Sequence, residues 1–162
     1  MTQADDRQAK VRKLIEDSRL AMLTSIDEDG RLVSKPMATQ EVEFDGDVYF
    51  TAERSSHKVR NITRDPRVNV AYSSSSAWVS LSGDAEVIED ADKLAELWNT
   101  FTDAWLEGGP ENPENVLIKV TAAAAEYWDT PNSKVVQVVN LVKAKVTGER
   151  FKGDNQTVDL ER

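Results

Sequence analysis

The chain has 162 residues, 40% hydrophobic and 30% charged, with a net charge of -9 and an isoelectric point near 4.7. These values predict a single globular domain over residues 1–162, and the negative charge argues against nucleic acid or an anionic membrane as the main partner. The chain has no cysteine and His57 is its only histidine, so disulfides, thiolate catalysis and a metal site are not expected. The start of the chain does not resemble a targeting signal, and no apolar run has the length of a membrane span, so a soluble, cytoplasmic protein is expected.

The first half of the chain predicts one helix followed by short strands. Apolar residues at helical spacing indicate a one-sided helix over residues 5–18. Compact or alternating apolar runs then indicate strands at residues 20–26, 31–44 and 48–51. The second strand contains Pro36, which cannot donate to a ladder and therefore requires an edge, a bulge or a point where the strand leaves its partner.

Residues 68–88 predict two further strands joined by a serine-rich turn. The second, residues 77–88, contains Gly83, which indicates a bulge or a bend. Five strands in succession, joined mostly by short turns, favour a closed or half-closed antiparallel barrel over a doubly wound sheet.

The last part of the chain changes period several times. Residues 90–106 carry one helical apolar stripe with two tryptophans, which favours core or interface anchors over a cofactor platform. Residues 116–128 predict a sixth strand. Valines at 135–142 fit a helix or a strand, and Gly148 as a C-terminal cap favours the helix. The polar tail after Phe151 is expected to pack late or fray.

A polar segment lies where the third predicted strand gives way to a helix. Ser55 or Ser56 can cap this helix, which ends before Pro66. Two hydroxyls, the His57 imidazole and the Lys58 ammonium then surround amides that lack intrahelical partners, a setting that favours an anion such as a phosphate. Taken alone, the segment is explained more simply as an ordinary cap beside a solvated lysine.

Several separated motifs become informative together. They are Ser34-Lys35-Pro36-Met37, Phe50-Thr51, Ser56-His57-Lys58, Asp65-Pro66-Arg67-Val68, Val79-Ser80-Leu81-Ser82-Gly83 and Glu126-Tyr127-Trp128-Asp129. In this order and with these spacings they resemble the general stress protein branch of the pyridoxamine 5′-phosphate oxidase-like, FMN-binding split-barrel family. The resemblance extends to about Leu160. It implies a mainly β fold with flanking helices, a six-stranded antiparallel Greek-key split β-barrel, and a homodimer with two flavin sites at its interface.

The resemblance also assigns the phosphate end of the flavin. Lys58, Ser56 and the basic Lys35 would hold the phosphate, with Ser55 beside them at the helix start. His57 would flank the phosphate or the ribityl chain. The expected cofactor is FMN, and FAD also fits if the site is open at the phosphate end.

The ring end of the flavin is assigned in the same way. The backbone groups expected along the isoalloxazine ring belong to Pro36, Met37, Phe50 and Thr51. The side chains of Met37 and Phe50 can supply an apolar wall. A second subunit would close the site, with Trp105 or Trp128 as the contact.

Two departures from the family pattern limit the function. Lys35 stands where arginine is common in this branch, and lysine lacks the bidentate fork of arginine. The true oxidases end in an arginine-rich substrate-binding segment, whereas this chain ends GDNQTVDLER. Oxidation of pyridoxamine phosphate is therefore not expected.

The leading hypothesis is a flavin-binding protein of the general stress type, with a redox role in a stress response. As an FMN-dependent oxidoreductase it would rely on the flavin for its chemistry, because no side-chain acid–base pair identifies a catalytic residue. Three alternatives stay open. They are a non-catalytic flavin sensor or storage module, a deazaflavin-dependent split-barrel reductase with basic residues for a longer tail, and a structural dimer whose site has decayed.

Overall fold

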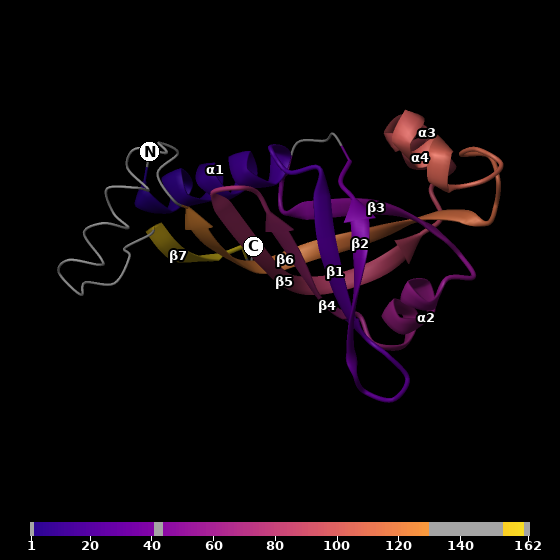
Figure 1. The fold of residues 1–162 in the computed structure, drawn as a ribbon, viewed down its shortest axis with the longest axis horizontal. Helices are drawn as coiled ribbons and strands as arrows, with labels where there is room; N and C mark the ends of the chain where they lie inside the picture. Colours follow the sequence, from indigo (N-terminus) through magenta and orange to yellow (C-terminus); the bar gives the residue numbers. More distant parts are fainter. Residues whose placement is uncertain (1, 41–43, 130–153, 161–162) are drawn as a thin grey trace.

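The computed structural model describes residues 2–40, 44–129 and 154–160, which form one sheet with flanking helices (Figure 1). The elements in chain order are α1 (Gln3–Glu16), β1 (Leu20–Ile26), β2 (Leu32–Ala38), β3 (Asp47–Glu53), α2 (His57–Arg64), β4 (Arg67–Ser73), β5 (Ala77–Ile88), α3 (Ala91–Leu97), α4 (Thr100–Trp105), β6 (Asn115–Asp129) and β7 (Asp154–Asp159). The six strands predicted up to residue 128 are all present. In these described segments no helix combines the length and the apolarity needed to cross a bilayer.

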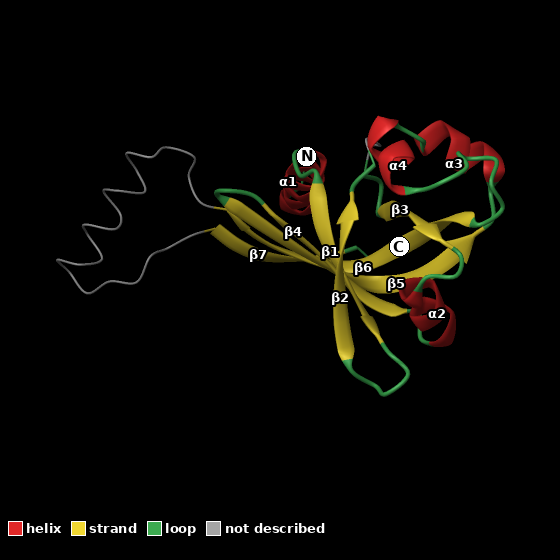
Figure 2. Cartoon of the chain, turned by 45° about the vertical axis from the view of Figure 1, so that its right-hand side comes forward, coloured by secondary structure: helices red, strands yellow, loops and turns green. Residues whose placement is uncertain are grey.

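The sheet is antiparallel and curls without closing. Its strand order is β2-β1-β4-β5-β6-β3, and β7 pairs with β6 beside this path. Among the described strands β2 pairs only with β1, and β3 pairs only with β6. The two end strands nevertheless come into contact, and Figure 2 shows them near each other after a 45° turn of the view. An antiparallel sheet whose ends meet without a ladder is a split barrel, as predicted.

The core lies on the concave face of the sheet, beneath α1. Val11 and Ile15 of α1 pack on side chains from the alternating inward positions of the strands. The largest fully buried side chains of this core are Tyr72, Phe50, Leu23, Ile62, Leu81 and Ile118, whereas Leu117 belongs to a second cluster with Leu94 and Leu97 of α3. Burying one such apolar side chain stabilises the fold by about 1.5–3 kcal/mol. The inward alternation therefore fixes the register of each strand.

Gly83 marks the bulge predicted in β5. The register between β5 and β6 shifts between Ser82 and Gly83. A Cβ atom at Gly83 would lie 2.0 Å from the carbonyl oxygen of Thr121, so only glycine permits this approach of the two backbones. The bulge adds local bend and twist to two of the longest strands, which helps the sheet to curl.

Pro36 occupies an edge, one of the alternatives predicted for it. It lies opposite Met22 of β1 on the end strand β2, so its missing N–H removes no bond to a further strand. The backbone groups on the outer edge of β2 are therefore free of any described strand and can bind another group.

The prediction of one continuous helix with a single apolar stripe over residues 90–106 is wrong. The structure has two short helices, α3 and α4, separated at Trp98 and Asn99. Asn99 caps α4, and its side-chain oxygen accepts from the backbone N–H of Thr102 at 2.9 Å. Leu94 and Leu97 of α3 are buried, whereas Phe101 and Trp105 of α4 are exposed. The interpretation of this stripe as core is therefore correct only for α3.

The C-terminal tail also differs from the prediction. Residues 154–159 form β7, an antiparallel strand along β6, so of the two expectations fraying is wrong and late packing stays a prediction. Its backbone bonds to β6 stabilise it even though its sequence is polar. The helix predicted around residues 135–148 lies outside the described residues.

Candidate functional site

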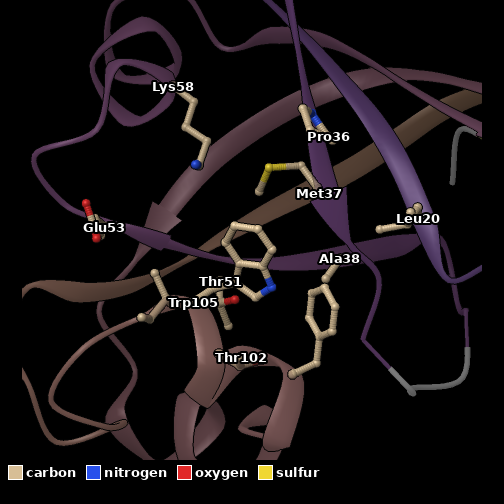
Figure 3. A pocket seen from close by; sticks show the side chains of 11 residues that line it. Leu20, Pro36, Met37, Ala38, Thr51, Glu53, Lys58, Thr102 and Trp105 are labelled. Atoms are coloured by element: carbon tan, nitrogen blue, oxygen red, sulfur yellow. The ribbon is translucent and has the colours of Figure 1, made fainter.

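A cavity of about 330 Å³ lies where β2 and β3 meet α2 and α4. It is lined by Leu20, Pro36, Met37, Ala38, Thr51, Glu53, Lys58, Phe101, Thr102, Trp105 and Leu106 (Figure 3). The cavity therefore occupies the opening of the split barrel, and its walls include both end strands. Most of the lining is apolar, and Lys58 and Glu53 are the charged side chains among these residues.

The alternation of β3 decides which of its side chains reach the cavity. Val48, Phe50 and Ala52 point into the core, while Thr51 and Glu53 lie on the opposite side and line the cavity. Phe50 is fully buried, so its side chain does not form the apolar wall expected of it. Its backbone still belongs to the strand that borders the cavity.

Lys58 enters the cavity from the first turn of α2. Figure 3 shows its ammonium group pointing toward Met37 and the Trp105 ring. Burial lowers the pKa of Lys58 below its usual value; the Glu53 carboxylate opposes this shift, and the Lys35 charge adds to it. A half-buried ammonium with a second cation nearby is a favourable partner for an anion, because an anion compensates for the lost hydration.

Ser56 caps α2 without using its side chain. The residue has the extended backbone of an N-cap, yet its hydroxyl makes no capping hydrogen bond. Its Oγ is buried and has no hydrogen-bond partner in the described part of the chain. The start of α2 therefore combines an unpaired hydroxyl with first-turn amides that this side chain leaves uncapped, and Lys58 belongs to the same first turn.

Arg54 fixes the turn that leads to Ser56. Its Nε and one terminal nitrogen donate to the carbonyl oxygen of Pro113 at 3.2 and 3.0 Å, and it forms an ion pair with Glu89. The backbone N–H of Arg54 donates to the Glu114 carbonyl at 2.7 Å. These bonds connect the end of β3 to the segment that follows α4. Arg54 therefore links the two elements that border the cavity, β3 and α4.

An aromatic wall, formed by Phe101 and Trp105 of α4, faces the two end strands across the cavity. Their ring centroids lie 6.1 Å apart with an interplanar angle of 39°. The side chains are 50% and 72% exposed, which is high for aromatic residues that line a cavity. Trp105 lines the cavity of the same chain as Lys58, and its contact with a second subunit stays a prediction. Trp128 lies elsewhere, on β6, where its cross-strand partner is Trp78 of β5.

The structure brings together part of the predicted set. Pro36, Met37, Thr51, Lys58 and Trp105 line the cavity. The other predicted residues do not line it. Exposed Lys35 comes directly before Pro36 in the chain, and Ser55, Ser56 and His57 come directly before Lys58. Phe50 lies in the core, and Trp128 lies on the face of the sheet.

Sequence reasoning missed six of the lining residues. They are Leu20, Ala38, Glu53, Phe101, Thr102 and Leu106. Two carried a usable signal, because Phe101 lies four residues before Trp105 on one helical stripe and Glu53 lies two residues after Thr51 on one strand face. The others come from elements whose approach only the curled sheet determines.

The sequence pattern of the family described as "Pyridoxamine 5′-phosphate oxidase like" matches residues 6–152. The chain belongs to this family. The resemblance inferred from the separated motifs is therefore confirmed.

Relatives of this pyridoxamine 5′-phosphate oxidase-like protein include the protein bli-3 of Neurospora crassa. It is 28% identical over 144 residues, which are 82% of this chain and 69% of the relative. The crystal structure of a general stress protein 26 from a Jannaschia species has a TM-score of 0.78 and 26% identity over 96% of this chain and 99% of that one. The general stress FMN/FAD binding protein of Xanthomonas citri has a TM-score of 0.67 and 28% identity, over 80% and 92% of the two chains.

Proposed function

We propose that this chain binds a flavin nucleotide, FMN, in the cavity between β2, β3, α2 and α4, and that it does so as a homodimer with a redox role of the general stress type. The observation that carries the proposal is a half-buried Lys58 that lines a mostly apolar cavity, while the hydroxyl of Ser56, at the N-cap of the same helix, is buried without a partner among the described residues. Each of these polar groups is costly in the ligand-free protein, and a phosphate would satisfy both.

The phosphate end is proposed at the start of α2. A dianion there gains the Lys58 ammonium, the Ser56 hydroxyl and the amides of the first turn, with Lys35 as a further positive charge. Hydrogen bonds to charged groups contribute about 1.5–3 kcal/mol each. This end of the cavity attracts an anion although the protein as a whole carries a charge of -9.

The ring end is proposed between the end strands and the aromatic wall. Pro36 and Met37 form one apolar side, and Phe101 and Trp105 form the other. The volume of about 330 Å³ lies at the lower end of the range for small-molecule sites, which suits a ring system whose other edge stays open. The outer edges of β2 and β3 offer backbone groups to the ring heteroatoms, because no described strand pairs with them.

A second copy of the chain is proposed on the open side of the cavity. Leu20, Met22, Trp78 and Trp128 are 58%, 41%, 45% and 37% exposed on one face of the sheet. Leu20 also lines the cavity, so this apolar face is continuous with the flavin site. Exposed apolar surface rich in tryptophan is typical of subunit interfaces. In this arrangement Trp128 is the residue that a partner would supply.

The relatives support the nature of the ligand. The Xanthomonas citri protein is a general stress protein that binds FMN/FAD, and its structure covers 80% of this chain. The bound flavin would supply electron transfer, while residues of the chain bind the phosphate, orient the ring and restrict solvent. Lys58 and Glu53 are the ionisable groups among the lining residues. Because Lys58 is assigned to the phosphate, Glu53 is the ionisable side chain of this lining that has no assigned role.

The decisive experiment compares FMN with riboflavin, which has the same ring system and no phosphate. Titration of the apoprotein, followed by flavin fluorescence, is expected to show FMN binding at least about tenfold tighter, equivalent to about 1.4 kcal/mol. Equal affinities would place the phosphate elsewhere, and a protein that binds no flavin would refute the proposal. FAD and a deazaflavin, titrated in parallel, identify the preferred cofactor. Reduction of the bound flavin by a nicotinamide nucleotide then separates an oxidoreductase from a non-catalytic flavin sensor.

A further inference from the structure

A second, much smaller cavity lies between the C-terminal half of α1 and strands β3 and β4. Its volume is about 20 Å³, and its apolar wall includes Ile15, Phe44 and Val48. The side chains of Tyr72 and Gln40 are among the polar ones that line it. A space of this size holds one water molecule and is too small for any organic ligand.

The hydroxyl of Tyr72 is a buried polar group without a partner. The residue is 2% exposed, and its Oη makes no hydrogen bond to any described residue. Burial raises the pKa of Tyr72, so the group is a neutral O–H that can donate and accept. An unpaired hydroxyl in an apolar interior destabilises the folded state, and a partner in the adjoining space removes this cost.

Gln40 presents the complementary group. Its Nε2 is buried and has no partner among the described residues. Its Oε1, at the other end of the same amide, accepts from Nδ2 of Asn99 at 3.3 Å. Asn99 in turn caps α4, because its Oδ1 accepts from the backbone N–H and the hydroxyl of Thr102 at 2.9 and 3.2 Å.

Three other polar side chains at this cavity have partners. The hydroxyl of Thr39 donates to the Ser18 carbonyl at 2.7 Å, and Asp47 pairs with Lys119 at 3.5 Å. The Glu16 carboxylate accepts from the backbone N–H of Phe44 at 3.4 Å. In the described part of this lining, the buried side-chain polar atoms without a partner are Tyr72 Oη and Gln40 Nε2.

We propose that the small cavity is a binding site for one internal water molecule that bridges Tyr72 Oη and Gln40 Nε2, and that Gln40 is thereby fixed as the positioning residue of α4. The water accepts from the amide of Gln40 and exchanges a hydrogen bond with the hydroxyl of Tyr72. Bridging two buried polar groups is the usual role of internal water.

The bridge links the core to the flavin cavity. The chain of contacts runs from Tyr72 through the water to Gln40, then to the Asn99 cap and to Thr102, which lines the larger cavity. The helix held in this way carries Phe101 and Trp105. Only this last step, from α4 to a bound ring, rests on the proposed function, because the water site and the cap are properties of the ligand-free chain.

A double-mutant cycle on the flavin-free protein tests the bridge. The variants are Tyr72→Phe, Gln40→Leu and the double variant, and the measurement is the urea midpoint of unfolding. Tyr72→Phe is expected to lower the midpoint, and the double variant is expected to lower it by less than the sum of the single effects. A hydroxyl without a partner predicts the opposite, because its removal leaves the midpoint unchanged or raises it. That result, or strict additivity, would overturn the proposal.

Hydrogen exchange tests the positioning role by a readout that global stability does not determine. In Tyr72→Phe, the amides of α4 are expected to exchange at least about threefold faster under native conditions, whereas those of α2 keep their rates. Unchanged exchange in α4 would remove the positioning role. Both measurements omit flavin, so their failure is distinguishable from a failure of flavin binding.

Discussion

Replacing Lys58 by methionine is expected to weaken FMN binding while leaving riboflavin binding nearly unchanged. Methionine keeps an unbranched apolar stem and removes the ammonium, so the substitution isolates the charge. A charge-assisted hydrogen bond contributes about 1.5–3 kcal/mol, which corresponds to a loss of about 10- to 150-fold in FMN affinity. Lys58→Ala removes the stem as well, so the loss of FMN binding free energy is expected to be at least as large, and in any case more than about 1 kcal/mol.

The stability of the ligand-free protein should respond in the opposite direction. Burial lowers the pKa of Lys58, so folding disfavours its charged form. This cost is present while the lysine is protonated and is relieved as the pH rises through its folded pKa. Lys58→Met is therefore expected to leave the free energy of unfolding unchanged or to raise it at neutral pH.

The assay is a flavin fluorescence titration of three proteins with FMN and with riboflavin. The matched control is Lys13→Met, which removes an exposed lysine of α1 and makes the same change in net charge. Long-range attraction alone would make both variants lose FMN affinity equally. That result, or an equal loss of FMN and riboflavin in Lys58→Met, would refute the assignment of the phosphate to the start of α2.

Three further substitutions test other parts of the structure. Ser56→Ala removes a buried hydroxyl that makes no capping bond, so urea unfolding should show unchanged or higher stability without flavin, together with weaker FMN binding; lower stability without flavin would contradict this. Gly83→Ala places a Cβ against the Thr121 carbonyl and is expected to cost about 1–3 kcal/mol in thermal unfolding, and an unchanged melting temperature would exclude the close approach. Leu20→Glu puts a charge on the proposed interface, so sedimentation should show monomers; a wild-type protein that is already monomeric would reject the homodimer.

The strand pattern was predictable because most of its causes are local. Alternation in residues 77–88 reports which side of the sheet is buried, and β5 has those same bounds. Gly83 signalled its bulge, and Ser56 with Pro66 signalled the two ends of α2. The same alternation already implied that Phe50 and Thr51 face opposite sides of β3, and of these two side chains Thr51 lines the cavity.

The parts that sequence reasoning missed depend on partners distant along the chain. β7 is polar, and only the exposed edge of β6 makes it a strand. The break between α3 and α4 follows from the Asn99 cap, whereas the apolar stripe on either side of it suggested one continuous helix. Glu53 and Phe101 became site residues because the sheet brings β3 and α4 to the same opening.

The position of the site follows from the way the sheet fails to close. β2 and β3 stand at opposite ends of the strand order, so each keeps one edge that no described strand satisfies. Exposed edges of this kind are normally a liability, because they invite pairing with another chain. Here Pro36 lies on one of them, Lys58 reaches the gap from α2, and α4 covers it from a third side. The residues that would hold a phosphorylated ring are therefore gathered where the barrel's own hydrogen bonding is incomplete. The apolar face that begins at Leu20 lies on the rim of the same opening. A flavin and a second chain would consequently stabilise each other, because each would bury surface that the other leaves exposed.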